Sequence, residues 1–187
     1  MRIVAGRFKG FKLDSPRTRN IRPTADRVRE ALFSIIAARV PDARVLDLFA
    51  GTGALGLEAL SRGAAEAVFV DQSAEAVKII RTNIQRLGVD DRVEVFHGDV
   101  AQVLRRLAGR NSRFDLIFMD PPYGKGLVEM TLIRLGELAD ADAMLIAEHP
   151  AKEIAPDCSV EWRRIDRRSY GDTAVSFYCK ETPHNHY

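Results

Sequence analysis

Residues 45–56 read Val-Leu-Asp-Leu-Phe-Ala-Gly-Thr-Gly-Ala-Leu-Gly. An apolar run leads into a glycine turn of the form Gly-x-Gly-x-x-Gly, and a helix-forming run follows. Glycines at such a strand-to-helix turn let the backbone approach a ligand closely, because no Cβ intervenes. Asp71 lies twenty residues beyond Gly51, at the end of the next apolar run, where a carboxylate can accept hydrogen bonds from a ribose diol. The stretch therefore predicts a cofactor site at the turn.

The glycine pattern alone does not distinguish NAD from S-adenosylmethionine. Asp47 precedes Gly51 by four residues, and its charge would repel the pyrophosphate that a dinucleotide places at a helix N-terminus. S-adenosylmethionine has no phosphate and carries a sulfonium and an ammonium, which suit a nearby carboxylate. We therefore predict S-adenosylmethionine as the cofactor, and Asp47 disfavours the alternative of an NAD-dependent dehydrogenase.

From residue 44 onward, short apolar runs alternate with helical patterns. The patterns predict strands at 44–49, 67–71, 93–97, 114–119 and 144–148, and helices at 54–62, 73–87, 100–108 and 127–138. This alternation indicates a mostly parallel sheet with helices on both faces. Residues 159–168 and 173–179 are interpreted as an antiparallel β pair. Upstream, residues 2–14 predict a small hairpin, and a helix is expected from Pro23 to before Pro41.

A second motif, Asp120-Pro121-Pro122-Tyr123, ends the strand predicted at 114–119. Ligands of open α/β sheets bind beyond the carboxyl ends of the strands, so this motif should face the same crevice as the glycine turn. A nucleobase amine is a poor nucleophile, because its lone pair is delocalised into the ring. The Asp120 carboxylate and the Pro121 carbonyl can accept its two N–H bonds, and Tyr123 can stack on the base, worth about 1–3 kcal/mol. The motif predicts group transfer to a nucleobase amine.

Asp99 follows the strand predicted at 93–97 and has two interpretations. It can accept a hydrogen bond from an adenine amino group, or it can cap the next helix. Both can hold. Glu148-His149-Pro150, at the end of the fifth predicted strand, is interpreted as a strand-end cap that can also edge the site.

Composition limits the kind of protein that carries these motifs. The chain has 187 residues, of which 46% are hydrophobic and 29% charged, and no apolar run suits a membrane span or a signal peptide. Cys158 and Cys179 lack zinc-site spacing, so we expect no metal and a cytoplasmic location. Net charge is +2, but residues 1–44 hold eleven Lys and Arg against four Asp and Glu. This segment is either a polyanion-binding surface or a solvated charged face.

Together the motifs resemble those of class I S-adenosylmethionine-dependent methyltransferases, and more closely those of the bacterial RsmD family. That family methylates the exocyclic N2 amine of one guanine in small-subunit (16S) ribosomal RNA. The resemblance runs from Arg2 to about Lys180. Besides the glycine and Asp-Pro-Pro-Tyr motifs, it is carried by Arg-Ile-Val-Ala-Gly-Arg-Phe-Lys-Gly-Phe-Lys-Leu from residue 2 and Arg-Pro-Thr-Ala-Asp-Arg-Val-Arg-Glu-Ala-Leu-Phe from residue 22.

The resemblance implies a Rossmann-like sheet of seven strands, mostly parallel with the last antiparallel, after a small amino-terminal hairpin and helix. We expect a basic extension over 1–22, a methyltransferase domain over 23–180 and a flexible tail over 181–187. The implied catalytic residues are Asp120, Pro121, Pro122 and Tyr123. The expected cofactor-binding residues are Arg22, Thr24, Asp47, Phe49, Ala50, Gly51, Thr52, Gly53, Asp71, Gln72, Asp99 and Val100. The expected RNA contacts are Arg7, Lys9, Lys12, Arg17 and Arg19.

The expected partner is small-subunit ribosomal RNA or the 30S particle, because the chain has no room for a large target-reading domain, and a monomer is expected. A methyltransferase acting on adenine N6 in DNA or on another amine remains an alternative, as does a non-enzymatic RNA-binding assembly factor. One cluster matches nothing in the family pattern: Arg163, Arg164, Arg167 and Arg168.

Overall fold

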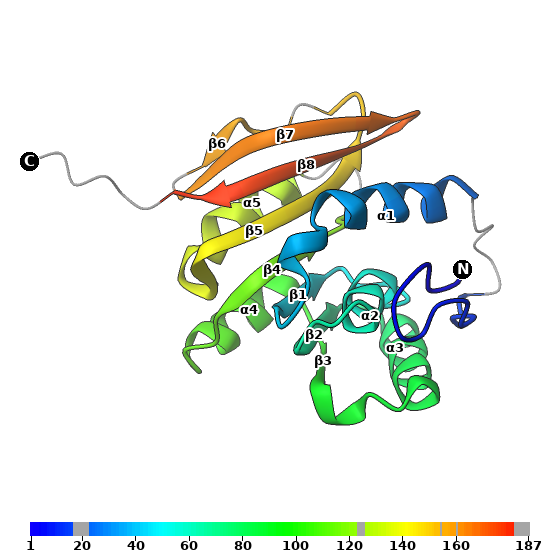
Figure 1. The fold of residues 1–187 in the computed structure, drawn as a ribbon. Coiled ribbons are helices and arrows are strands. Elements are labelled where there is room, and N and C mark those ends of the chain that lie inside the picture. Colours follow the sequence, from blue (N-terminus) through cyan, green and yellow to red (C-terminus); the bar gives the residue numbers. More distant parts are fainter. Residues whose placement is uncertain (17–22, 123–125, 154, 160, 182–187) are drawn as a thin grey trace, which may run out of the picture.

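The computed structural model describes residues 1–16, 23–122, 126–153, 155–159 and 161–181, without the side chains of residues 23–25. A single sheet runs through the molecule (Figure 1). Its strands are β1 (Arg44–Leu48), β2 (Glu66–Asp71), β3 (Val93–His97), β4 (Phe114–Met119), β5 (Ala139–Pro150), β6 (Cys158–Ser159), β7 (Trp162–Tyr170) and β8 (Thr173–Lys180). The helices are α1 (Pro23–Ile35), α2 (Ala54–Ser61), α3 (Ala74–Leu87), α4 (Val100–Ala108) and α5 (Leu127–Leu135), with 3-10 turns at Ala37–Arg39, Asp90–Arg92 and Gly136–Leu138.

The sheet has the spatial order β3-β2-β1-β4-β5-β8-β7-β6. Strands β3, β2, β1, β4 and β5 are parallel, and β8, β7 and β6 each pair antiparallel to the preceding neighbour in that order. The mostly parallel α/β architecture is confirmed, but the sheet has eight strands rather than the expected seven. The additional strand, β6, has only two residues, too few for any hydrophobic periodicity to reveal it.

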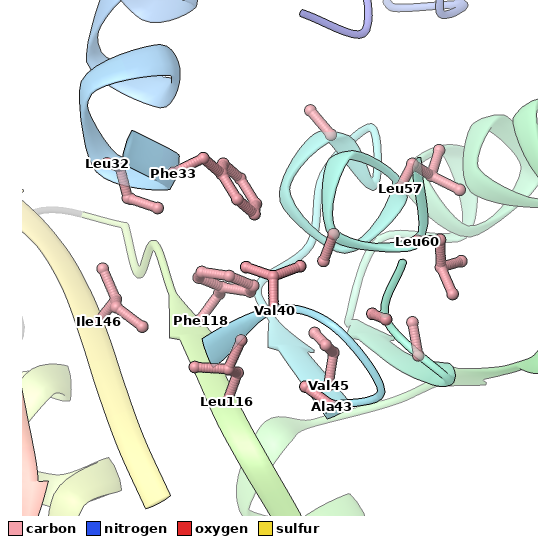
Figure 2. Close-up of a cluster of buried hydrophobic side chains, with 14 of the residues drawn as sticks. Leu32, Phe33, Val40, Ala43, Val45, Leu57, Leu60, Leu116, Phe118 and Ile146 are labelled. Carbon is pink, nitrogen blue, oxygen red and sulfur yellow. The ribbon is translucent and has the colours of Figure 1, made fainter. Parts of the chain in front are cut away.

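Helices cover both faces of the sheet, as the near-continuous apolar run of β4 predicts. One face carries α1, α2 and α3, and the other carries α4 and α5. Figure 2 shows part of the hydrophobic core under α1, α2 and α3, which we call the first core. Here Phe33 of α1 packs on Phe118 of β4 with ring centroids 5.6 Å apart. No helix in the described part of the chain is long and apolar enough to cross a membrane.

The amino-terminal segment, residues 1–16, forms less β structure than expected. Its antiparallel pairing is limited to one bridge, Arg2 with Lys12, and a few hydrogen bonds around it. The backbone N–H groups of Val4 and Ala5 are donated to a side chain of α2 instead of a partner strand. Ile3 and Leu13 are buried in the first core, so the segment is part of the domain packing. The predicted boundary at residue 22 lies outside the described residues, as does most of the predicted tail.

Candidate active site

The carboxyl ends of β1 and β4 bring the two sequence motifs side by side. The strands are parallel neighbours with Leu48 opposite Met119, and the Asp120 N–H donates to the Leu48 carbonyl at 3.4 Å. The glycine turn begins directly after β1, and Asp120 directly after β4. Residues separated by about 70 positions in sequence therefore flank one point on the sheet edge.

The glycine turn has a backbone that requires its residue types. Gly51 and Gly53 have φ of 58° and 75°, in the left-handed region that glycine adopts without penalty. Phe49 also has a positive φ, 58°, which costs a bulky residue on the order of 1–3 kcal/mol. A Cβ on Gly53 would lie 3.3 Å from Phe69 and Ile80. The turn is therefore closely packed against the side chains of Phe69 and Ile80, and its backbone is strained at Phe49.

Asp47 lies beneath this turn and caps the first helix after it. Its Oδ2 accepts a hydrogen bond from the Gly56 N–H at 2.9 Å, and the residue is only 2% exposed. Burial raises the pKa of Asp47 to about 8, although the hydrogen bond from Gly56 lowers it. The charges of Asp120 and Asp71 also raise this pKa. The carboxylate is thus close to both motifs.

Asp71 joins the end of β2 to the glycine turn. Its Oδ2 accepts from the Gly51 N–H at 2.8 Å and its Oδ1 from the Ser73 N–H at 2.8 Å. A carboxylate oxygen can accept a second hydrogen bond, so these contacts orient the group without using up its capacity. Next to it, Gln72 is exposed.

Asp99 caps α4, the structural interpretation of the two left open by the sequence. Its side chain accepts from the Gln102 N–H at 3.1 Å, while the residue remains exposed. Val100, the next residue, is buried.

The other predicted site residues are either described by the structure or lie outside the described residues. Phe49, Ala50 and Thr52 are half-buried, Pro121 is buried, and Asp120 and Pro122 are exposed at the sheet edge. Five lie outside what the structure describes, either entirely or in their side chains: Arg22, Tyr123, Arg17 and Arg19 entirely, and Thr24 in its side chain. Arg7, Lys9 and Lys12 are exposed on the amino-terminal segment.

Four carboxylates share one face of the sheet near its carboxyl edge. Phe69, Phe118 and Ile146 all belong to the core under α1, α2 and α3. Because strand side chains alternate, residues two positions further along, Asp71, Asp120 and Glu148, lie on this same face. Asp47 lies on it too, since Val45 belongs to that core. Such an acidic edge suits a cationic ligand and is unfavourable for a pyrophosphate.

Glu58, which the sequence analysis did not single out, holds the amino-terminal segment on α2. It is fully buried, and its two oxygens accept from the N–H groups of Val4 at 2.7 Å and Ala5 at 3.0 Å. Arg62 Nε donates to it at 2.8 Å, and Arg29 Nε of α1 lies 3.5 Å away. A Glu within the apolar helix sequence Ala-Leu-Gly-Leu-Glu-Ala-Leu is the sequence signal for a buried, paired charge.

Asn83 joins the same segment to the glycine turn. Its Oδ1 accepts from the Asp14 N–H at 2.7 Å, and its Nδ2 donates to the carbonyls of Asp14 at 3.2 Å and Thr52 at 3.1 Å. The side chain is fully buried. An Asn on the apolar face of the α3 pattern, between Ile80 and Leu87, could have indicated this contact. The basic segment is thereby fixed against the site.

Comparison with known proteins shows the family. The chain matches the family model described as Conserved hypothetical protein 95 over residues 1–179. It is 35% identical over 184 residues to Ribosomal RNA small subunit methyltransferase D of Escherichia coli strain K12, covering 97% of this chain and 90% of that protein. The chain belongs to the RsmD family. Another relative, Putative rRNA methyltransferase YlbH of Bacillus subtilis strain 168, is 34% identical over 182 residues, covering 96% and 99% of the two chains.

Solved structures of similar chains have the same fold. The putative methyltransferase yhhF from Escherichia coli superposes with a TM-score of 0.85 at 33% identity, covering 97% of this chain and 98% of that one. SMU.776, a putative methyltransferase complexed with SAH, has a TM-score of 0.70 at 16% identity, covering 85% of this chain and 50% of that one. At that identity the likeness concerns the fold only. This RsmD-family chain therefore has the class I methyltransferase fold.

Proposed function

We propose that this protein transfers the methyl group of S-adenosylmethionine to the exocyclic N2 amine of a guanine in small-subunit ribosomal RNA. The observation that carries the proposal is the adjacency of the glycine turn after β1 and the Asp120 motif after β4. The substrate class follows the printed names of the relatives, which include ribosomal RNA small subunit methyltransferases. We further propose that it acts in the cytoplasm as a monomer, on RNA within the 30S particle.

The residues around the turn fit a cofactor that is cationic and carries no phosphate. Gly51 and Gly53 give the turn its left-handed backbone, and the carboxyl groups of Asp47 and Asp71 lie beside it. Burial raises the pKa of Asp47 to about 8, and a bound cation would favour its ionised form. In the proposed site Asp71 takes the ribose hydroxyls and Asp99 the adenine amine. The remaining lining residues are Arg22, Thr24, Phe49, Ala50, Thr52, Gln72 and Val100. When bound, S-adenosylmethionine supplies an electrophilic methyl group on a sulfonium.

The Asp120 motif would hold the acceptor amine. In the proposed complex, Asp120 and the Pro121 carbonyl accept the two amine N–H bonds, Pro122 stiffens the wall, and Tyr123 stacks on the base. Holding nitrogen in line with the methyl group contributes by proximity, an effect that reaches about 7–11 kcal/mol in well-oriented systems. The methylated nitrogen is cationic and acidic, so it loses its proton without a strong base.

Basic residues of the amino-terminal segment would contact the RNA phosphates. Arg7, Lys9 and Lys12 are exposed, and the segment is fixed to α2 and α3 by Glu58 and Asn83. We propose the same role for Arg17 and Arg19, and a functional division between this extension and the methyltransferase domain near residue 22. A segment anchored beside the glycine turn would orient folded RNA over the site.

Nucleoside analysis of small-subunit ribosomal RNA from cells lacking the gene tests this function. We expect the loss of one N2-methylguanosine per small-subunit RNA, restored by the wild-type gene and by a control, Asp142→Asn, which changes an exposed acid on β5. Asp120→Ala should not restore it. Loss of N6-methyladenosine, labelling of DNA or protein by a tritiated methyl donor, or full restoration by Asp120→Ala would contradict the proposal.

A further inference from the structure

Glu148 is a carboxyl group beside Asp120 that has no role in the proposed methyl transfer. Strands β4 and β5 are parallel, with Met119 opposite Ala147, so the next positions, Asp120 and Glu148, are opposite each other. Neighbouring strands lie about 4.8 Å apart, and both residues are on the face that carries Phe118 and Ile146. Glu148 is the third residue from the carboxyl end of β5, which extends to Pro150 and so includes the triplet interpreted as a strand-end cap.

The surroundings of Glu148 differ from those of the other acids at this edge. Asp47 and Asp71 each accept backbone N–H groups. Within the described residues, no hydrogen bond or ion pair reaches the half-buried Glu148 carboxyl. Its neighbour on β8 is the apolar Val175. Burial raises the pKa of Glu148 to about 7, and the charge of Asp120 contributes in the same direction. A partly buried carboxyl without a protein donor at this edge of the sheet is available to a donor on a ligand.

Guanine presents the donors that two such acceptors would satisfy. Its N1–H is adjacent to its N2 amine, whereas adenine presents a bare N1 acceptor next to its own amine. In the proposed function, Asp120 holds the N2 amine. Resting on the proposed function, we propose that Glu148 accepts the N1–H of the target guanine and so selects guanine over bases that lack this donor. A base with an N1 lone pair would instead meet the carboxylate and leave it unpaired.

The inference is tested with RNA that carries 2-aminopurine in place of the target guanine. This base keeps the exocyclic amine but has no N1–H. Methylation rates of both RNAs are compared for the wild type, Glu148→Leu, which removes the acceptor, and Glu148→Gln, which keeps a neutral one. The ratio of the guanine rate to the 2-aminopurine rate should be roughly 10- to 100-fold larger for the wild type than for Glu148→Leu. The ratio for Glu148→Gln should lie between these two values.

A pH profile gives a second readout that a structural role would not move. The wild-type preference for guanine should rise between pH 6 and pH 8 as Glu148 ionises, because burial and the charge of Asp120 raise the pKa of Glu148 to about 7. The preference of Glu148→Gln should be flat, and its affinity for S-adenosylhomocysteine and its thermal stability confirm that the variant is folded. Equal preferences in all three proteins would overturn this inference alone, whereas a wild type that methylates no guanine would overturn the proposed function as well.

Discussion

Asp47 combines nearly complete burial with a pKa of about 8, and this makes it a stability switch. Between pH 5 and pH 8 the folded state holds a proton on this carboxyl that the unfolded state, with its ordinary pKa, has lost. Folding is therefore favoured at lower pH, and this contribution decreases as pH rises towards 8. A cation bound near the carboxylate would reverse the trend by favouring the ionised form.

Asp47→Asn should remove this pH dependence while keeping an oxygen that can accept from Gly56. Relative to the wild type, the free energy of unfolding of the variant should increase from pH 6 to pH 8, by at most about 1.4 kcal/mol per pH unit. Urea unfolding at three pH values measures it. Glu148 is present in both proteins and cancels in the difference. Asp142→Asn is the control, and a difference between the wild type and the Asp47→Asn variant that stays constant with pH would refute the assignment.

At the scale of elements, the amino-terminal segment is held by a buried charge and not by strand pairing. Glu58 receives two backbone N–H groups of the segment and two arginines, Arg29 and Arg62. Arg29 is itself 4% exposed, and it also pairs with Asp26 at 3.1 Å and donates to the Arg2 carbonyl. The segment, α1 and α2 therefore meet at one side chain.

Glu58→Ala should lower the free energy of unfolding by about 3–5 kcal/mol, because it removes a buried carboxylate that accepts two backbone N–H groups and pairs with Arg62. Hydrogen exchange at the Val4 and Ala5 amides should also accelerate. The control is Glu66→Ala, which removes an ion pair of similar geometry, 2.6 Å from Arg44, in which both side chains are 46% exposed. That loss should be below about 1 kcal/mol. Equal losses in the two variants would show that Glu58 does not anchor the segment.

Across the whole molecule, two basic regions lie at different ends of the fold. Arg7, Lys9 and Lys12 are on the amino-terminal segment. On β7, next to the two-residue edge strand β6, Arg163 pairs with Glu181 at 2.6 Å and Arg168 with Asp166 at 2.8 Å, while Arg167 donates to the Ala151 carbonyl. Acidic neighbours offset much of the β7 charge, and charged side chains protect a sheet edge from pairing with other chains. We assign RNA binding to the first region.

Replacing Arg7, Lys9 and Lys12 together by Gln should weaken binding to small-subunit RNA and flatten its salt dependence. Each lost phosphate contact lowers the slope of log K against log salt concentration by about 0.7–0.9, so the slope should fall by about 2–3. Filter binding at salt concentrations from about 50 to about 200 mM measures this. Replacing Arg163, Arg167 and Arg168 is the matched control. If the control flattens the slope more, the RNA crosses β7 instead.

Much of the fold could be predicted because the strands and helices carry strong local signals. The apolar run of β4, the helical spacing of α4 and the capping Asp99 placed these elements within a residue or two of the observed bounds. The two-residue strand β6 was missed, and β5 extends from Ala139, earlier than its apolar run from Met144 indicated. In these segments pairing with a neighbour, and not side-chain pattern, determines the strand.

The sequence by itself determined the alternating α/β order, the glycine turn and the Asp120 motif, because each depends on residues close together along the chain. Only the tertiary structure decided that Glu148 lies opposite Asp120, that Glu58 holds the amino-terminal segment and that Asn83 joins it to Thr52. These contacts join segments that only the packed sheet and helices bring together. Local propensity cannot encode them, since the partner of a buried polar side chain is chosen by the register and packing of distant elements.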